Sequence, residues 1–182
     1  DDLARRAERI AKMAHEANQE ARNLSHGLWP REIQPPDLPV ALRDLLEVPR
    51  SAGWEAELAL ADPLPDLTVT EANQILGVAS EAVRNAVRHA GGSRLRLQLD
   101  IVRETLRDEI ARTAGADERL KLAVIDDGQG LGVEATSEGI GFRIMRHRAL
   151  LVGARLSVEP RNDLGGTTIS LDLPLYQRRG DV

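Results

Sequence analysis

The chain has 182 residues, among them 24 Lys and Arg, 29 Asp and Glu and no Cys, and its formal net charge is −5. This length is sufficient for one domain with a hydrophobic core and an appendage, and with only 2% aromatic residues the core must be aliphatic. The acidic balance argues against a nucleic-acid partner, which requires a basic excess, and the absence of Cys excludes disulfides and thiolate chemistry.

The sequence carries no sign of membrane insertion or export. No apolar run approaches the length of a transmembrane helix, and no signal peptide is recognisable. We therefore expect this part of the protein to be cytoplasmic and to contain no membrane segment. Because the chain begins with Asp1 inside a helical pattern, we also expect a fragment, with any membrane anchor upstream.

The N-terminal segment predicts a helix with a dimerisation seam. Its apolar residues recur in steps of four and three, the heptad spacing of a helix that packs on a second helix: Leu3, Ala7, Ile10, Ala14, Ala17, Ala21, Leu24 and Leu28. We favour a homodimer formed through residues 1–28. The alternative is an amphipathic helix that packs on its own domain.

The segment 70–90 predicts an amphipathic helix that Gly91-Gly92 ends. Its polar side carries Glu81, Arg84, Asn85 and Arg88, with His89 at the edge. Mg²⁺ takes hard oxygen ligands and retains water molecules, so Asn85 would supply a carbonyl oxygen and Glu81 would orient a water. Arg88 would meet phosphate oxygens. The alternative, for this helix alone, is an ordinary solvated face.

Three glycine-rich segments follow this helix. They are Asp126-Asp127-Gly128-Gln129-Gly130 after an apolar run, Gly139-Ile140-Gly141 before a predicted helix, and Gly165-Gly166-Thr167 before the last predicted strand. Each alone indicates only a turn. However, free N–H groups at a helix N-terminus favour phosphate, and an ionised aspartate accepts hydrogen bonds, as an adenine amine requires.

Together with the segment around Glu81 and Asn85, these segments resemble the N, G1, G2 and G3 boxes of the GHKL ATPase superfamily, specifically the catalytic domain of a bacterial sensor histidine kinase. The short stretch between G1 and G2 and the run 141–160 resemble the nitrate/nitrite-sensor-like branch. The resemblance covers roughly 38–176. It implies a GHKL (Bergerat) α/β sandwich, a mixed sheet with helices on one face, preceded by a dimerisation-type helix.

The resemblance also implies ligands and binding residues. ATP and Mg²⁺ would be bound, with Asn85 on the metal, and with Asp126 on the adenine amine, supported by the Thr167 hydroxyl. Glu81 and Asn85 would be catalytic, Asp127 structural, and 129–138 the ATP lid. The residues expected to bind ATP are Asn85, Arg88, His89, Asp126, Gly128, Gly130, Gly139, Gly141, Gly166 and Thr167.

The implied activity is donation of the ATP γ-phosphoryl group to a histidine on a dimerisation helix, for relay to an aspartate of a response regulator. His15-Glu16 resembles such an acceptor, but Glu20 stands where the branch has Gln, so we expect the acceptor upstream of Asp1. Two alternatives are a GHKL domain that hydrolyses ATP and a catalytically inactive module that binds nucleotide or dimerises.

The distribution of prolines and apolar residues predicts the boundaries of the domains and strands. We expect a dimerisation-helix end at 1–30, a proline-rich linker at 31–37, the ATP-binding domain at 38–176 and a tail at 177–182. Alternation predicts strands at 54–60, 95–101, 120–125, 154–158 and 167–173, with 95–101 and 120–125 antiparallel.

Periodicity predicts two further helices, at 40–48 and 140–152. In the second helix we expect Ile144, Met145, Ala149 and Leu150 to face inward and Arg143, Arg146, His147 and Arg148 mostly to be solvated. Thr70 is the expected N-cap of the central helix. Residues 103–119 read as an insertion with a short helix at 104–112.

Overall fold

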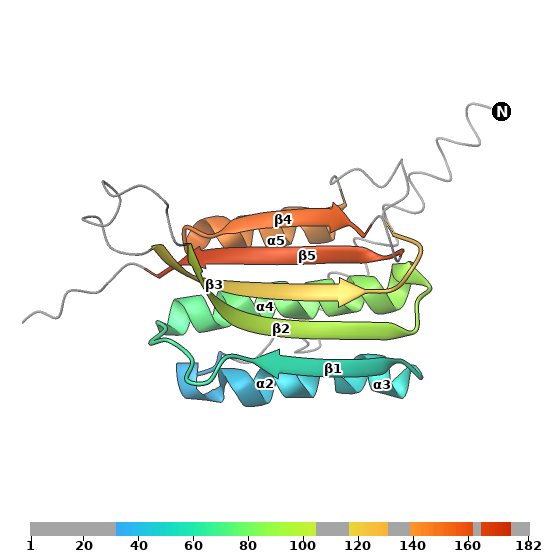
Figure 1. Ribbon diagram of the computed structural model, residues 1–182, viewed down its shortest axis with the longest axis horizontal. Helices are drawn as coiled ribbons and strands as arrows, with labels where there is room; N and C mark the ends of the chain where they lie inside the picture. Colours follow the sequence, from blue (N-terminus) through green and yellow to red (C-terminus); the bar gives the residue numbers. More distant parts are fainter. Residues whose placement is uncertain (1–31, 105–116, 131–138, 162–164, 176–182) are drawn as a thin grey trace, which may run out of the picture. The chain divides into compact units, whose positions relative to one another are not determined.

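The computed structural model of the protein describes residues 32–104, 117–130, 139–161 and 165–175 (Figure 1). The chain divides into two compact units, Asp1–Glu32 and Ile33–Val182. Apart from Glu32, every described residue belongs to the second unit. The predicted helix at 1–28, most of the predicted lid and the tail therefore lie outside the described residues.

A five-stranded mixed sheet forms the frame of the second unit. Its strands are β1 (Glu55–Leu60), β2 (Arg94–Glu104), β3 (Asp117–Asp126), β4 (Arg155–Pro160) and β5 (Thr167–Pro174). They lie in the order β1-β2-β3-β5-β4. β1 and β2 pair in parallel and all other neighbours are antiparallel, which confirms the mixed α/β fold and the predicted pairing of 95–101 with 120–125.

The register of the sheet explains the apolar alternation of the strands. Because neighbouring side chains along a strand point to opposite faces, paired apolar residues form rows across the sheet. One row crosses all five strands and consists of Leu58, Leu97, Val124, Ile169 and Val158. Leu97, Val124 and Ile169 in the centre of this row are buried.

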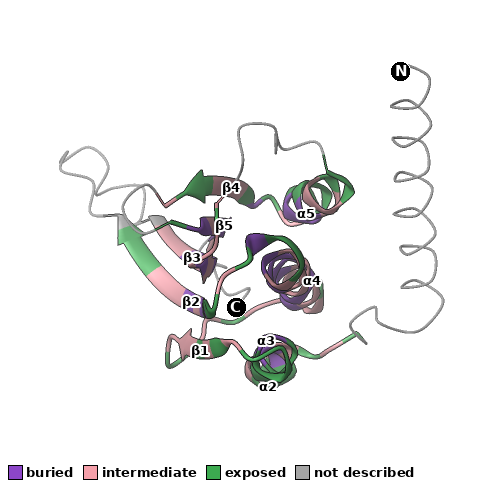
Figure 2. Cartoon of the chain, turned by 90° about the vertical axis from the view of Figure 1, so that its right-hand side faces the viewer, coloured by how far each residue is buried: buried purple, intermediate pink, exposed green. Residues whose placement is uncertain are grey.

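The helices cover one face of the sheet, as Figure 2 shows. After a short 3₁₀ turn η1 (Pro35–Asp37), they are α2 (Leu38–Leu45), α3 (Glu47–Ser51), α4 (Val69–Asn85) and α5 (Ile140–Leu151). The predicted helix at 40–48 is thus two helices. α4 lies between α2 and α5, and because it has neighbours on both flanks, its middle is buried over the whole run 75–79.

The N-cap of α4 is Thr68, so the prediction of Thr70 is wrong. Thr68 Oγ1 accepts a hydrogen bond from the Glu71 backbone N–H at 3.1 Å, and Glu71 Oε2 accepts one from the Thr68 N–H at 2.6 Å. This reciprocal capping box needs Glu or Gln three positions after the cap, and Thr68 is followed at that distance by Glu71 whereas Thr70 is followed by Asn73. α4 starts two residues earlier than the expected N-cap implied.

Asn73 on α4 fixes the chain just before the first helix. Its side-chain oxygen accepts from the Ile33 N–H at 3.0 Å, and its Nδ2 donates to the Ile33 carbonyl at 2.9 Å and to the Val69 carbonyl at 2.7 Å. Both peptide groups at Ile33 are therefore held by one side chain of α4.

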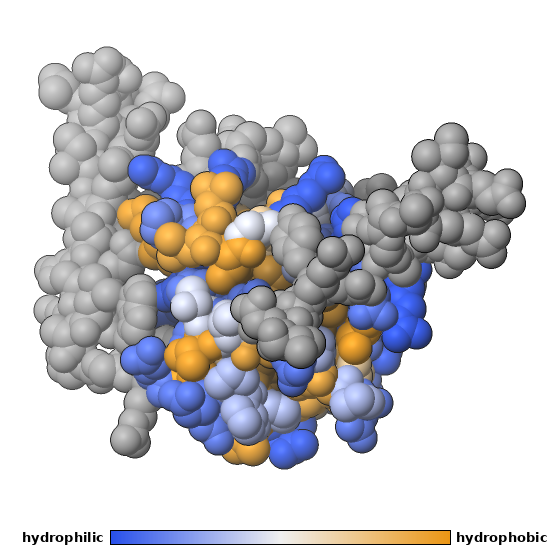
Figure 3. Space-filling model, turned by 90° about the vertical axis from the view of Figure 1, so that its left-hand side faces the viewer, coloured by the Kyte–Doolittle hydropathy of each residue, from blue (hydrophilic) through white to orange (hydrophobic). Residues whose placement is uncertain are grey.

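One prediction about α5 is wrong, because Leu150 is 71% exposed although it was expected inside. Of the four side chains expected mostly to be solvated, Arg143, Arg146 and His147 are exposed, whereas Arg148 is only 9% exposed. α5 ends beside the start of β4, since the Ala154 N–H bonds to Ala149 O. Figure 3 views this side of the molecule, where apolar surface lies among hydrophilic side chains.

The hairpin between β2 and β3 is longer than the alternation indicated. Its pairing continues to Glu104 opposite Asp117, so Glu104 belongs to a strand and cannot begin the predicted helix at 104–112. The rest of that segment lies outside the described residues. In the described parts of the chain, no helix combines the length and the apolar character needed to cross a membrane.

The capping box yields a first prediction. Thr68→Ala removes the side-chain acceptor for the Glu71 N–H and should lower the free energy of unfolding by about 1 kcal/mol. Thr70→Ala, at an exposed position inside the helix, should change it by less than about 0.5 kcal/mol. Urea unfolding followed by circular dichroism measures both, and an equal loss in the two variants would contradict the assignment of the cap.

Candidate functional site

Asp126, the last residue of β3, has a buried carboxylate with one oxygen already occupied. Oδ1 accepts hydrogen bonds from the backbone N–H groups of Gly128 at 2.9 Å and Thr167 at 3.3 Å. Burial raises the pKa of Asp126, and these two N–H groups oppose the shift. Among the described residues both bonds go to Oδ1, so Oδ2 remains available to accept a hydrogen bond from a ligand.

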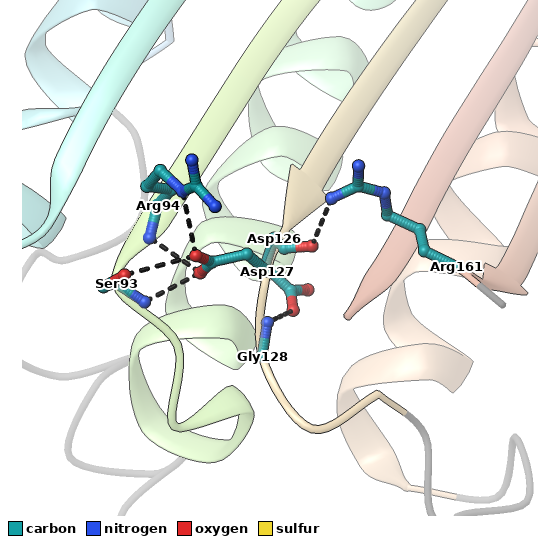
Figure 4. Close-up of polar contacts among 6 residues, drawn as sticks. All are labelled: Ser93, Arg94, Asp126, Asp127, Gly128 and Arg161. Atoms are coloured by element: carbon teal, nitrogen blue, oxygen red, sulfur yellow. Dashed lines mark hydrogen bonds and ion pairs between the residues drawn. The ribbon is translucent and has the colours of Figure 1, made fainter. Parts of the chain in front are cut away.

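The Asp127 side chain points away from that of Asp126, towards Ser93 and Arg94 at the start of β2, and it stabilises the fold. Its carboxylate accepts from the N–H groups of Ser93 and Arg94, each at 2.7 Å, and from the Arg94 Nε at 3.1 Å (Figure 4). Although burial acts in the opposite direction, these donors hold the pKa of Asp127 well below its usual range. The assignment of Asp127 as a structural residue agrees with these contacts.

The turn after β3 packs directly on the end of the central helix. A single wide π-helical turn, η2 (Ala86–Ala90), continues α4, and Gly91 ends it with a φ of 60°. The Gln129 N–H donates to the Ala90 carbonyl at 2.8 Å. A Cβ on Gly128 would lie 2.2 Å from that same carbonyl oxygen, so only glycine permits this approach.

Gly166 also permits a close backbone approach that a side chain would block, in this case to Asp126 itself. It has a φ of 97°, and a Cβ there would lie 2.0 Å from the Asp126 carbonyl oxygen. Gly130, with a φ of 75°, lies close to the Gly166 carbonyl. Of the glycines expected from the sequence, Gly128, Gly130 and Gly166 therefore bring their backbone together around Asp126, and we call this group the Asp126 enclosure.

The second part of the site lies where α4 meets the first turn of α5. Gly139 is the N-cap of α5. A Cβ on Gly141 would lie 2.3 Å from Glu81 Oε1 and 3.3 Å from Asn85 Nδ2. Glu81 and Asn85 therefore face the helix N-terminus, whose first N–H groups have no partner within the helix and attract anions.

Glu81 is held from its own helix as well. It forms an ion pair with Arg84, one turn further along α4, and its side chain is only 15% exposed. The Arg84 Nε is buried and has no hydrogen-bond partner among the described residues. Arg88 and His89 are exposed in the wide turn, and in the described part of the chain neither bonds to the other candidate residues.

Three contacts differ from what the sequence indicated or were missed. Thr167 reaches Asp126 through its backbone N–H, whereas the resemblance implied its hydroxyl. Arg161, expected only in a turn, donates to the Asp126 carbonyl at 3.1 Å (Figure 4). Arg148 donates to Gln74 Oε1 at 2.8 Å across the α4–α5 contact. Backbone acceptors and interhelical partners leave no local sequence signal.

The donor set fits a metal ion that is shared with a ligand. Within the described segments, no group of three or more His, Asp or Glu side chains could hold a metal. A magnesium ion with one amide oxygen from Asn85 would need phosphate oxygens and water for its remaining positions, which is its usual way of binding.

Comparison with known proteins gives a family match. Residues 70–177 match the family described as histidine kinase-, DNA gyrase B- and HSP90-like ATPases. The matched segment contains α4, the Asp126 enclosure and α5.

The chain is also similar to bacterial sensor proteins. It is 30% identical over 142 residues to the nitrate/nitrite sensor protein NarQ of Escherichia coli, covering 76% of this chain and 22% of that protein. It is 29% identical over 155 residues to the histidine-protein kinase/phosphatase UhpB of Salmonella typhimurium, covering 84% and 28%. The chain thus spans less than a third of these two relatives.

A solved structure agrees with the sequence matches. The histidine kinase domain of the blue-light activated histidine kinase EL346 of Erythrobacter litoralis superposes with a TM-score of 0.58 at 26% identity. The similarity covers 77% of this chain and 60% of that one.

The opposite environments of the two adjacent aspartates yield a second prediction. Asp126→Asn retains an oxygen for both N–H donors and removes a buried charge, so the ligand-free variant should be at least as stable as wild type at pH 7. Asp127→Asn loses charge-assisted hydrogen bonds and should lose about 1–2 kcal/mol at that pH. Asn at 126 should abolish ATP binding, whereas Asn at 127 should preserve it.

Unfolding measured from pH 7 to pH 3 checks the assignment. The pKa of Asp127 is lowered by folding, so its stabilisation is present above the unfolded pKa of about 3.9 and is lost as the pH falls below it. The pKa of Asp126 is raised, so ionisation of Asp126 costs stability as the pH rises through its folded pKa. An Asp126→Asn variant with ATP affinity within about twofold of wild type would refute the role of Asp126.

Proposed function

Because this chain belongs to the histidine kinase-, DNA gyrase B- and HSP90-like ATPases and is the ATP-binding catalytic domain of a sensor histidine kinase, we propose that it donates the γ-phosphoryl group of ATP to a histidine on a dimerisation helix. A response regulator would then receive the group on an aspartate. Since the chain spans less than a third of NarQ and UhpB, this activity belongs to a longer protein.

One observation carries the proposal: two glycine-containing turns pack against the same helical stretch, which consists of the second half of α4 and of η2. The Asp126 enclosure packs on Ala90 at the end of the helix, and the N-terminus of α5 packs on Glu81 and Asn85. A nucleotide with its adenine on Asp126 Oδ2 would extend its phosphates along α4 to the free N–H groups of α5. Base and phosphate recognition thus share one helix.

The residues beside the phosphates supply positioning and charge. Asn85 would hold Mg²⁺ through its amide oxygen, and bound Mg²⁺ neutralises charge that develops on the phosphates. Glu81, oriented by Arg84, would accept a hydrogen bond from the acceptor group or a water. Arg88 and His89 are exposed at the end of the helix and are proposed to contact phosphate oxygens.

The wider assembly follows from the same proposal. Residues 1–28 carry the heptad seam and would form the homodimer, residues 31–37 the linker, and 38–176 the catalytic part. Such a domain works in the cytoplasm, where ATP and the response regulator are. A domain that hydrolyses ATP to drive a clamp is the second candidate, since the family includes DNA gyrase B- and HSP90-like ATPases.

A third prediction separates metal binding from fold. Asn85→Ala should weaken ATP binding by about tenfold with Mg²⁺ present, because the metal loses its protein ligand, and by far less in EDTA. Calorimetric titration in both buffers measures the difference. Gln34→Ala, which removes an exposed amide before the first helix, is the control and should change neither affinity. An equal loss with and without Mg²⁺ in Asn85→Ala would instead assign Asn85 a structural role.

A fourth prediction separates the candidate activities. Incubated with γ-labelled ATP and Mg²⁺, the chain should bind nucleotide but acquire no acid-labile, base-stable label, because the acceptor is expected upstream of Asp1. Label that disappears in His15→Gln would show that the acceptor lies within this sequence. Sustained release of free phosphate over many turnovers would favour the ATP-hydrolysing alternative.

A further inference from the structure

Two charged side chains cross the contact between α4 and α5, and each one lies against a glycine of the other helix. Glu81 of α4 lies against Gly141, where a Cβ would come within 2.3 Å of its Oε1. Arg148 of α5 lies against Gly77, where a Cβ would come within 2.6 Å of both Cζ and Nη1 of the guanidinium. The two contacts are reciprocal, and a methyl group at either glycine would displace a charged side chain.

Arg148 is built into this contact. It is 9% exposed, and its Nη1 donates to Gln74 Oε1 at 2.8 Å. Burial lowers the pKa of Arg148, while the charge of Glu81 opposes that shift. A guanidinium taken out of water is expensive unless its surroundings compensate, and here the hydrogen bond to Gln74 and the nearby charge of Glu81 contribute to that compensation and hold the side chain between the two helices.

The position of Arg148 along α5 connects it to the N-terminal turn of that helix. Arg148 and Gly141 are seven residues apart, which is about two helical turns or about 10 Å along the same face. A helix of this length behaves as a rigid rod. Fixing α5 at Arg148 therefore also fixes how far its N-terminal turn advances along α4 towards Glu81 and Asn85.

We propose that Arg148 is a positioning residue of the nucleotide site, which by its place on Gly77 and its bond to Gln74 sets α5 along α4 so that the N-terminus of α5 meets the phosphates. This inference rests on the proposed function. It assigns Arg148 to the phosphate end alone, because the Asp126 enclosure is formed by the end of β3, the start of β5 and η2, without α5.

The test compares ATP with adenosine, which lacks the phosphates. Arg148→Met keeps the aliphatic stem and removes the guanidinium, and it should weaken ATP binding about tenfold or more. Its affinity for adenosine, measured by NMR titration, should stay within about twofold of wild type. Arg155→Met, which removes the same charge from an exposed position on β4, is the matched control and should change neither affinity.

A second pair of variants tests the contact itself. Gly77→Ala places a methyl group where the guanidinium lies and should reproduce the loss of ATP affinity. In an Arg148→Ala background the side chain that meets this methyl group is absent, so adding Gly77→Ala should cost less than about twofold.

The outcomes are distinct. Equal loss of ATP and adenosine affinity in Arg148→Met would reduce Arg148 to a purely structural residue, and unchanged affinity for both would refute the inference outright. Additive effects of the two substitutions would also refute it. A wild-type chain that binds no ATP would overturn the proposed function, and this inference with it.

Discussion

The contact between the Gly128 turn and the end of the central helix is the constraint on which the rest of the site depends. The Ala90 carbonyl accepts a hydrogen bond from Gln129 and leaves no room for a side chain at 128. This contact joins the turn after β3 to η2, which continues α4, and it adds to the packing of α4 on β3. It holds the turn that follows Asp126 against the continuation of the helix that carries Asn85.

The two neighbouring aspartates have different roles, one in the candidate site and one in the stability of the fold. Asp127 is surrounded by donors and contributes to stability, whereas Asp126 is buried and has one oxygen without a hydrogen bond from the described residues. A protein selected only for stability would not bury a carboxylate in this way. The cost is consistent with a ligand donor that completes the hydrogen bonding when it binds.

Local patterns predicted most of the fold. Alternation located the strands, because a strand with one buried face repeats every second residue, and the row from Leu58 to Val158 bears this out. The predicted N-cap, Thr70, lies two residues after the observed one, because Thr68 and not Thr70 has a Glu three residues further on with which it forms a capping box. Periodicity did not single out Arg148 as the buried one of the four polar side chains of α5, because a helical period cannot show that Gly77, far away in sequence, offers space for a guanidinium.

The candidate site divides in the same way. The resemblance predicted Glu81, Asn85, Asp126 and the glycines as site residues, and their roles towards metal, adenine and phosphate stay predictions. Arg161 could not be predicted, since its partner is a backbone carbonyl that any residue would provide. The contacts of Thr167, Arg161 and Arg148 that the sequence did not indicate all join segments that are far apart in the chain.

The amide of Asn73 gives the central helix a mechanical role. It grips both peptide groups of Ile33, so a pull or a twist on the chain at that point cannot be absorbed by the linker unless these hydrogen bonds break, each with a net worth of about 1 kcal/mol. Short of that, the load passes into α4. Asn85 lies on the same helix about 18 Å further on, so a displacement at Ile33 would be passed along α4 towards the residue that is proposed to bind the metal.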